Sequence, residues 1–112
     1  MGQMFTYKCT GCNYSVLTSA GIDYGMLAVV ETHICKKCRH IVDVTVGEHG
    51  KVYSKEELKL YPEKKNPDLD YYKCPRCGND STLVKWNTRK RPCPRCDGKM
   101  DIDPEGERVL WD

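Results

Sequence analysis

All eight cysteines of this 112-residue chain occur in C-x2-C pairs, and none stands alone. The pairs are Cys9/Cys12, Cys35/Cys38, Cys74/Cys77 and Cys93/Cys96. Two thiols separated by two residues sit on a tight turn that presents both sulfurs to one ion, and two such turns complete a tetrahedral site. A disulfide scaffold would scatter its cysteines and require an oxidising compartment, for which the residues before Cys9 offer no export signal. The pattern therefore predicts two structural Zn²⁺ ions.

The residues that follow each pair fit a metal-binding turn in three of the four cases. Such a turn commonly needs a positive φ after its second cysteine, which Gly, Asn and Asp tolerate best. Asn13, Gly78 and the Asp97-Gly98 dipeptide comply, whereas Arg39 departs from the pattern. We therefore expect the Cys35/Cys38 turn to take another backbone shape or to be strained.

The gaps between the pairs favour sequential metal sites. They are C-x2-C-x22-C-x2-C, then 35 residues, then C-x2-C-x15-C-x2-C. The second quartet falls within the usual zinc spacing of about 15 to 20 residues, and the first lies just outside it. Cross-braced RING or FYVE sites use a much shorter central gap, and the nested zinc domain of DnaJ-type chaperones carries a CxxCxGxG signature that is absent here. We expect each pair to share its ion with a neighbouring pair along the chain.

The segment 62–70, PEKKNPDLD, divides the chain, because its prolines and alternating charges interrupt any periodic pattern. We expect an N-terminal metal domain over residues 1–61, a linker over 62–70 and a C-terminal metal domain over 71–112. Ser54 and Glu57 form an S-x-x-E capping box, which predicts a helix of about two turns that Pro62 ends. Neither half can comfortably offset its chain entropy with apolar burial, so folding is expected to depend on metal.

Alternating and β-branched runs predict β hairpins around the cysteine pairs. Strands are expected at residues 5–8, 14–18, 26–34, 41–46, 82–86, 99–102 and 108–111. We expect 82–86 to pair with 99–102, and we expect Trp86, Trp111, Tyr71 and Tyr72 to form the small core of the second half. The predicted fold class is a small, metal-stabilised, mostly-β protein with two β-hairpin domains in tandem and one short helix.

Both quartets resemble zinc ribbons. The second, CPRCG…CPRCDGKM, looks like a zinc ribbon, and the first, CTGCNY…CKKCRH, is similar with a longer loop. The resemblance implies two zinc-ribbon or rubredoxin-like domains in tandem, with iron as the alternative metal. Its implied ligand sets are Cys9, Cys12, Cys35 and Cys38 for one ion, and Cys74, Cys77, Cys93 and Cys96 for the other. It implies no single function, because ribbons serve transcription factors, ribosomal proteins, enzyme appendages and docking modules.

The net charge does not describe a globally basic nucleic-acid binder. The formal charge of +2 treats cysteines as neutral, and two four-thiolate Zn²⁺ centres would bring it to about −2. Cations nevertheless gather beside an aromatic ring on an expected hairpin that carries Trp86, Arg89, Lys90 and Arg91. This combination can clamp phosphates and stack a base. The alternative is a solvated turn whose cations balance a zinc-thiolate centre.

No pattern indicates an enzyme. His33, His40 and His49 do not complete a catalytic metal site, and four sulfurs leave an ion no open position. We predict a cytoplasmic, non-catalytic zinc-binding adaptor that docks on a protein or nucleic-acid complex through loops 19–26 and 87–91. Two alternatives stay open: a nucleic-acid-binding ribbon acting through Arg89, Lys90 and Arg91, and a rubredoxin-type iron electron carrier. No membrane partner is expected, because no stretch is apolar enough to span a bilayer.

Overall fold

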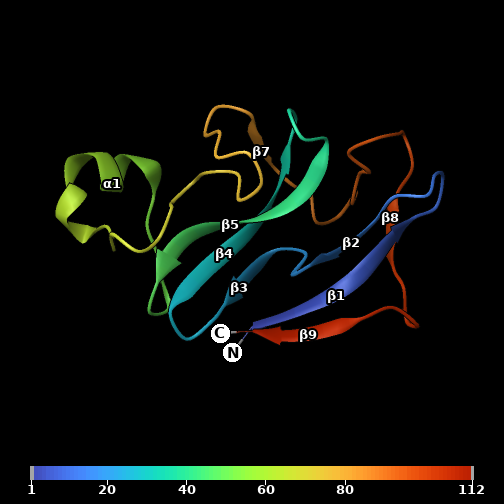
Figure 1. Ribbon diagram of the computed structural model, residues 1–112, viewed down its shortest axis with the longest axis horizontal. Helices are drawn as coiled ribbons and strands as arrows, with labels where there is room; N and C mark the ends of the chain where they lie inside the picture. Colours follow the sequence, from blue (N-terminus) through green and yellow to red (C-terminus); the bar gives the residue numbers. More distant parts are fainter. Residues whose placement is uncertain (1, 112) are drawn as a thin grey trace.

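The computed structural model describes residues 2–111, which form two antiparallel sheets and a short helix (Figure 1). The strands are β1 (Gly2–Cys9), β2 (Ser15–Thr18), β3 (Ile22–Tyr24), β4 (Ala28–Cys35), β5 (His40–Glu48), β6 (Lys51–Val52), β7 (Leu83–Lys85), β8 (Met100–Ile102) and β9 (Arg108–Trp111). Helix α1 (Lys55–Leu60) is followed by a 3₁₀ turn, η1 (Pro62–Lys64). The predicted fold class, mostly β with one short helix, is confirmed for the described residues.

Helix α1 lies where its capping signals predict it. The backbone N–H of Glu57 donates to the Ser54 hydroxyl at 3.0 Å, and Pro62 follows directly after the C-cap, Tyr61. The Glu57 carboxylate accepts a hydrogen bond from Lys64 Nζ at 2.7 Å. The short helix is therefore stabilised at both ends by contacts within its own segment.

Strand β1 is the centre of the first sheet. One edge of β1 pairs with β2, and the other edge pairs with β9 near its start and with β8 near its end. Gly2 is opposite Trp111 in this register, and Cys9 is opposite Met100. The two ends of the chain therefore share one sheet, as Figure 1 shows at its lower right.

The second sheet is built on the long antiparallel pair of β4 and β5. Strand β6 extends this sheet beyond β5, while β3 and β7 pair with successive parts of the other edge of β4. Val29 and Val30 on β4, and Val44 and Val46 on β5, are buried. The β4–β5 pair thus forms the most deeply buried part of this sheet.

The strands of the C-terminal segment do not pair with one another as predicted. Strand β7 adds to β4, with Val84 opposite Ile34, and β8 adds to β1, with Asp101 opposite Lys8. Two strands of three residues each make a marginal hairpin, whereas each gains a full set of partners at the edge of a longer strand. The segments 1–61 and 71–112 therefore do not form separate sheets.

Two buried clusters pack beside the cysteines. The first joins Trp86, Met100, Tyr14 and Ile41 to Cys9 and Cys93, and the second joins Val42 and Val44 to Cys35 and Cys74. The four predicted aromatic residues do not form one core of the second half: Trp86 is buried in the first cluster with residues of the N-terminal half, Tyr71 is buried outside both clusters, and Tyr72 and Trp111 are half-buried. Within residues 2–111, the structure contains no helix that is long and apolar enough to cross a membrane.

Candidate metal centres

The eight cysteines gather into two groups of four, but not into the predicted groups. The outer centre consists of Cys9, Cys12, Cys93 and Cys96, and the inner centre consists of Cys35, Cys38, Cys74 and Cys77. In each centre the four sulfur atoms lie within 4.8 Å of one another. The prediction of sequential sites is therefore wrong: the first pair joins the fourth, and the second joins the third.

Strand pairing explains this nesting. Cys9 ends β1, and its pairing with Met100 places the Cys93/Cys96 turn, which precedes β8, beside the Cys9/Cys12 turn. A hydrogen bond of 2.9 Å from Thr10 N–H to the Lys99 carbonyl fixes that contact. At the inner centre, Cys35 ends β4 and lies opposite Leu83 of β7, which follows the Cys74/Cys77 turn. In each centre, the strand that follows the C-terminal cysteine turn pairs with the strand that ends at the N-terminal cysteine turn. This strand pairing brings the two turns together.

The sulfur separations fit a tetrahedral metal site. The Sγ–Sγ distances are 3.4 Å for Cys9–Cys96 and 3.7 Å for Cys12–Cys93. At the inner centre they are 3.8 Å for Cys35–Cys77 and 4.0 Å for Cys38–Cys74. A tetrahedron with Zn–S bonds of about 2.3 Å has S–S edges of about 3.8 Å, whereas a disulfide bond is only about 2.05 Å long. The geometry therefore supports two zinc-ribbon-like metal sites formed by free thiols.

Backbone N–H groups point at all four sulfurs of the outer centre. The donors and acceptors are Gly11 to Cys9 at 3.3 Å, Tyr14 to Cys12 at 3.5 Å, Arg95 to Cys93 at 3.4 Å and Gly98 to Cys96 at 3.2 Å. At the inner centre the Thr82 hydroxyl lies 3.2 Å from Cys35 Sγ. Hydrogen bonds of this kind stabilise the thiolate form, which is the form that binds metal.

One thiol in each centre has a lowered pKa. The N–H of Gly11 lowers the pKa of Cys9 to about 7 in spite of burial. Burial opposes ionisation of Cys35, but the Thr82 hydroxyl and the Cys38 N–H outweigh it and lower the pKa of Cys35 to about 6. Burial, together with the neighbouring thiols, raises the pKa of Cys38 to about 12. Because four adjacent thiols do not all ionise without a cation, this donor set fits a divalent metal.

The turns of the two centres differ in backbone shape. Arg39 and Gly78, which follow the second cysteine of each inner pair, have φ values of +51° and +76°. Arg39 therefore adopts a left-handed backbone that residues other than glycine rarely adopt, which is the strained one of the two expected alternatives. Asn13, Asp97 and Gly98 are not among the described residues with positive φ, so the prediction for the outer turns is wrong.

Glycine is required at position 98 for a different reason. A Cβ atom at this position would lie 2.7 Å from Cys9 Sγ and 3.1 Å from Cys96 Sγ. Gly98 thus allows the backbone to pass close to the sulfurs of the outer centre.

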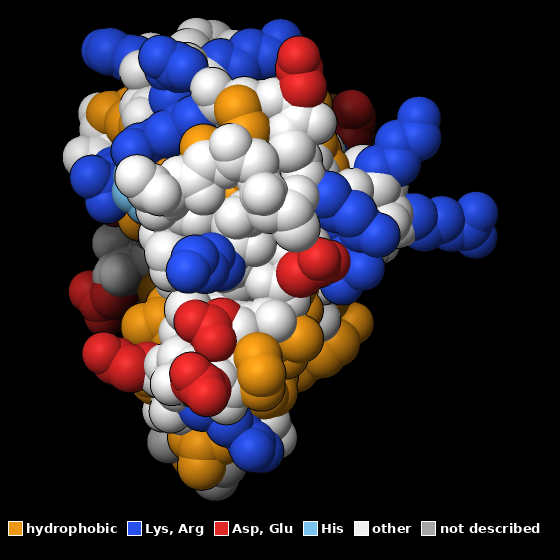
Figure 2. Space-filling model, turned by 90° about the vertical axis from the view of Figure 1, so that its right-hand side faces the viewer, with side chains coloured by type: hydrophobic (Ala, Val, Ile, Leu, Met, Phe, Trp, Pro, Cys, Tyr) orange, Lys and Arg blue, Asp and Glu red, His pale blue; other side chains and the backbone are white. Residues whose placement is uncertain are grey.

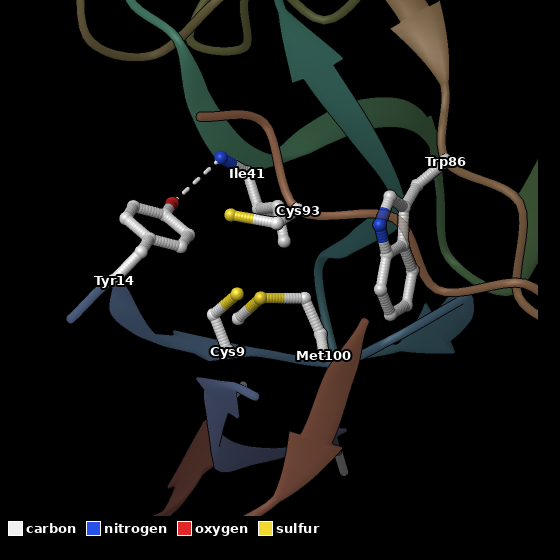
Figure 3. Close-up of a cluster of buried hydrophobic side chains, with 6 residues drawn as sticks. All are labelled: Cys9, Tyr14, Ile41, Trp86, Cys93 and Met100. Atoms are coloured by element: carbon white, nitrogen blue, oxygen red, sulfur yellow. Dashed lines mark hydrogen bonds between the residues drawn. The ribbon is translucent and has the colours of Figure 1, made fainter. Parts of the chain in front are cut away.

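Trp86 covers the outer centre and is not a surface residue (Figure 3). Its side chain is 2% exposed, its indole Nε1 donates to the Pro92 carbonyl at 3.0 Å, and Tyr7 packs edge-on against it. Met100, which is fully buried, belongs to the same cluster as Cys9 and Cys93. The expectation that Trp86 stacks a base is therefore inconsistent with its position.

The Arg and Lys side chains of the 87–91 loop are more exposed than Trp86. The Asn87 side chain accepts from the N–H groups of Arg89 at 3.0 Å and Lys90 at 2.9 Å, so both residues are held in a turn with exposed side chains. Arg91 is half-buried and lies 3.7 Å from Asp101. Figure 2 shows Lys and Arg side chains gathered on the upper part and along one side of one face of the molecule, with Asp and Glu mainly below them.

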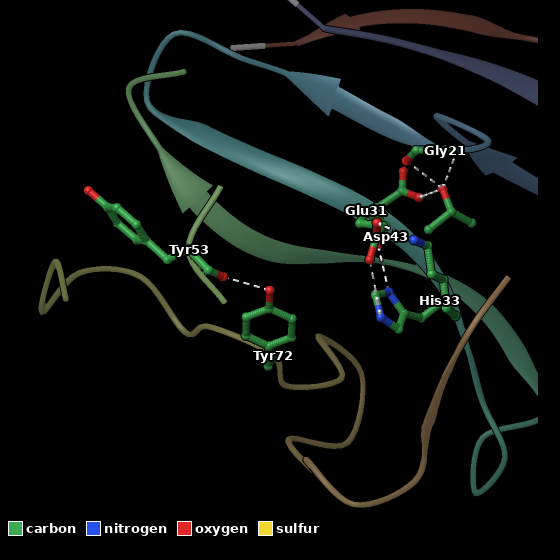
Figure 4. Close-up of polar contacts among 8 residues, drawn as sticks. Gly21, Glu31, His33, Asp43, Tyr53 and Tyr72 are labelled. Carbon is green, nitrogen blue, oxygen red and sulfur yellow. Dashed lines mark hydrogen bonds and ion pairs between the residues drawn. The ribbon is translucent and has the colours of Figure 1, made fainter. Parts of the chain in front are cut away.

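Sequence reasoning missed a polar cluster that joins the two sheets. Asp43 on β5 accepts hydrogen bonds from the hydroxyls of Thr18 at 2.8 Å and Thr32 at 2.7 Å, and from the Ser19 N–H at 2.9 Å. Thr32 also contacts Gly21 through two hydrogen bonds, and this region is drawn in Figure 4. The one signal in the sequence was an acidic residue within the alternating run of 41–46.

Comparisons of the chain with protein-family models, with curated proteins and with solved structures returned no match. The two cysteine centres and their surroundings are therefore the basis for a functional proposal.

Proposed function

We propose that this protein is a non-catalytic zinc-binding adaptor, in which two Zn²⁺ ions fix a β scaffold that presents loops to a partner protein or nucleic-acid complex. The main support is the ligand arrangement: each centre takes one cysteine pair from each half of the chain. Four cysteines complete a tetrahedral shell and leave no position for water or substrate, as in structural zinc sites. Zn²⁺ would supply the positive charge that keeps all four thiols ionised.

The metal can be identified directly. Protein purified without chelators should contain two zinc equivalents and should have no colour. Iron with a red visible spectrum would favour the rubredoxin-type electron carrier, whose four-sulfur ligand set is the same. Fewer than two metal equivalents in freshly prepared, reduced protein would contradict the proposal.

The segment of residues 19–26, expected to be a loop but containing strand β3 (Ile22–Tyr24), is the first candidate for docking a protein. Its side chains include Met26, which is 73% exposed, and Tyr24, which is 47% exposed. A Tyr24→Ser/Met26→Ser variant should lose a partner that the zinc-loaded parent retains in a pull-down. Leu110→Ser is the matched control, because Leu110 is an exposed apolar residue on β9. Equal partner retention by both variants would exclude this loop as the docking site.

A second candidate function is nucleic-acid binding through Arg89, Lys90 and Arg91. It is favoured by the exposed side chains of Arg89 and Lys90, for which the described residues provide no ion pair. Binding to a single-stranded oligonucleotide should weaken steeply with salt and should be lost in the triple alanine variant. Salt-independent binding, or binding that the triple variant retains, would exclude this function.

A further inference from the structure

The two metal centres are connected by a reciprocal pair of arginines. Arg39 directly follows Cys38 of the inner centre, and Arg95 lies between Cys93 and Cys96 of the outer centre. Arg39 Nη2 donates to the backbone carbonyl of Arg95 at 3.1 Å, and Arg95 Nε donates to the backbone carbonyl of Arg39 at 3.1 Å. Each side chain therefore holds the backbone of the other centre's turn.

Tyr14 forms a second connection. Its N–H donates to Cys12 Sγ of the outer centre at 3.5 Å. Its hydroxyl accepts from the Ile41 N–H at 2.8 Å (Figure 3). The same hydroxyl is hydrogen-bonded to Nδ1 of His40. His40 and Ile41 begin β5, shortly after Cys38 in the chain. The Arg95 guanidinium lies over the Tyr14 ring, 4.7 Å from its centre. When the start of β5 is ordered, it therefore positions Tyr14 beside the Cys9/Cys12 turn, and through the Tyr14 ring it positions Arg95 in the Cys93/Cys96 turn.

The chain topology couples the centres independently of these contacts. Cys12 and Cys93 are 81 residues apart, and the inner centre lies within this stretch, joining Cys35 to Cys77 across 42 residues. Closing the inner centre therefore shortens the remaining outer loop to about half its length. Loop-closure entropy varies with the logarithm of loop length, so this shortening favours the outer centre by about two- to threefold.

We propose that the two centres bind metal as one positively cooperative unit, with the inner centre loading first. The inner centre closes the shorter loop, and its formation fixes the Arg39 backbone and the Ile41 N–H that the outer turns contact. The outer metal in turn strengthens inner binding by the same factor, because coupling between two binding sites is reciprocal. This inference rests on the proposed function, since it requires that both centres bind metal.

The test is a zinc titration of the reduced, metal-free full-length chain, with the species counted by native mass spectrometry. Two independent sites with the affinities measured in the single-ligand variants Cys93→Ser and Cys74→Ser set the share of the one-metal form that is expected at one zinc equivalent without coupling. Cooperative loading should leave a smaller share in that form, with more metal-free and two-metal molecules. A one-metal share equal to or above the value for independent sites would overturn the proposal. If the chain binds two zinc ions independently, only the coupling fails; if it binds fewer than two at saturation, the proposed function fails as well.

The connecting residues are tested with matched double variants. Arg39→Ala/Arg95→Ala should increase the share of the one-metal form, because it removes the reciprocal hydrogen bonds without changing a ligand. Arg89→Ala/Lys90→Ala removes the same number of exposed cations but neither of these bonds, and should behave as the parent does. Identical distributions for the two double variants would remove the arginine pair from the mechanism.

The reciprocity and the loading order are tested with single-ligand variants. Cys74→Ser disables the inner centre and Cys93→Ser disables the outer centre. Each should bind its remaining zinc about fivefold or more weakly than the same centre binds in the parent, with similar factors for both. Cys93→Ser, which keeps the inner centre, should bind its zinc more tightly than Cys74→Ser. Undiminished affinities, or the reverse order, would contradict the proposal.

Discussion

Cys9 and Cys96 lie 87 residues apart in the chain, and their Sγ atoms lie 3.4 Å apart. The contact occurs at one end of a sheet in which β1 pairs with both C-terminal strands, β8 and β9. A metal at this position would act as a cross-link between the two ends of the chain. Cross-links that close long loops remove the most freedom from the unfolded chain, so the outer centre is well placed to stabilise the whole fold.

Separated halves of the chain should be poor metal binders. Fragments 1–61 and 62–112 each contain four cysteines, but each holds only half of the ligands of both centres. We expect each fragment to bind zinc much more weakly than the full chain and to lack a near-UV circular dichroism signal. Mixing the reduced fragments with zinc should restore both properties. Tight binding and an ordered spectrum in fragment 1–61 alone would instead support sequential sites.

Chelation should unfold the protein rather than leave an empty scaffold. Structural zinc contributes about 10 to 16 kcal/mol in small sites, which exceeds the usual net stability of a domain of about 5 to 15 kcal/mol. A strong chelator should therefore abolish the near-UV signal and the cooperative thermal transition. Excess zinc added afterwards under reducing conditions should restore them. A thermal transition that persists after complete metal removal would show that the apolar clusters are sufficient.

Gly98→Ala should damage the outer centre specifically. The added methyl group would lie 2.7 Å from Cys9 Sγ, so the sulfur or the Gly98 backbone would have to move. We expect weaker zinc binding and a lower melting temperature. Gly78→Ala is an informative comparison, because a Cβ at Gly78 meets no atom within 4 Å and its only penalty is the strain of φ at +76°. Equal zinc affinity in Gly98→Ala and the parent would exclude the steric argument.

The sequence was sufficient to locate much of the local structure, although the short strands β3 and β6 were not predicted. The alternating run from Ile41 lies in β5, and the Ser54 cap begins α1, because both signals depend on residues that are neighbours in the chain. It was also sufficient to identify all eight metal-ligand candidates, since a C-x2-C pair carries its own turn geometry. These features depend only on residues that lie close together in the chain.

The pairing of the strands, and of the cysteine turns, could not be predicted in the same way. Spacing favoured joining Cys12 to Cys35, but the short strands β7 and β8 pair with the edges of the longer strands β4 and β1 and not with each other. The contact of Arg39 with Arg95 depends on that pairing and has no signal in the local sequence. Zinc spacing rules assume that the two turns belong to one hairpin, which is not the case here.

Removing the carboxylate of Asp43 should loosen the contact between the two sheets. Asp43→Ala leaves the buried hydroxyls of Thr18 and Thr32 and the Ser19 N–H without this acceptor. The free energy of unfolding should fall by about 1 to 3 kcal/mol in urea titrations, which is the typical cost of a buried polar group that loses its partner. Asp70→Ala, at an exposed acidic residue, should change stability by less than about 0.5 kcal/mol. Similar losses in both variants would assign the effect to charge alone.

Replacement of Trp86 distinguishes a buried metal cover from a nucleic-acid contact. Trp86→Ala would open a cavity beside Cys9 and Cys93, and truncations of this kind cost about 3 to 5 kcal/mol. The variant should therefore lose stability and transfer zinc to a competing chelator faster than the parent, whereas Trp86→Phe should lie between the two. Trp111→Ala, at a half-buried tryptophan on β9, should affect zinc release less. If Trp86→Ala kept the stability and zinc-release rate of the parent but lost affinity for an oligonucleotide, the indole would act at the surface and the buried position would be wrong.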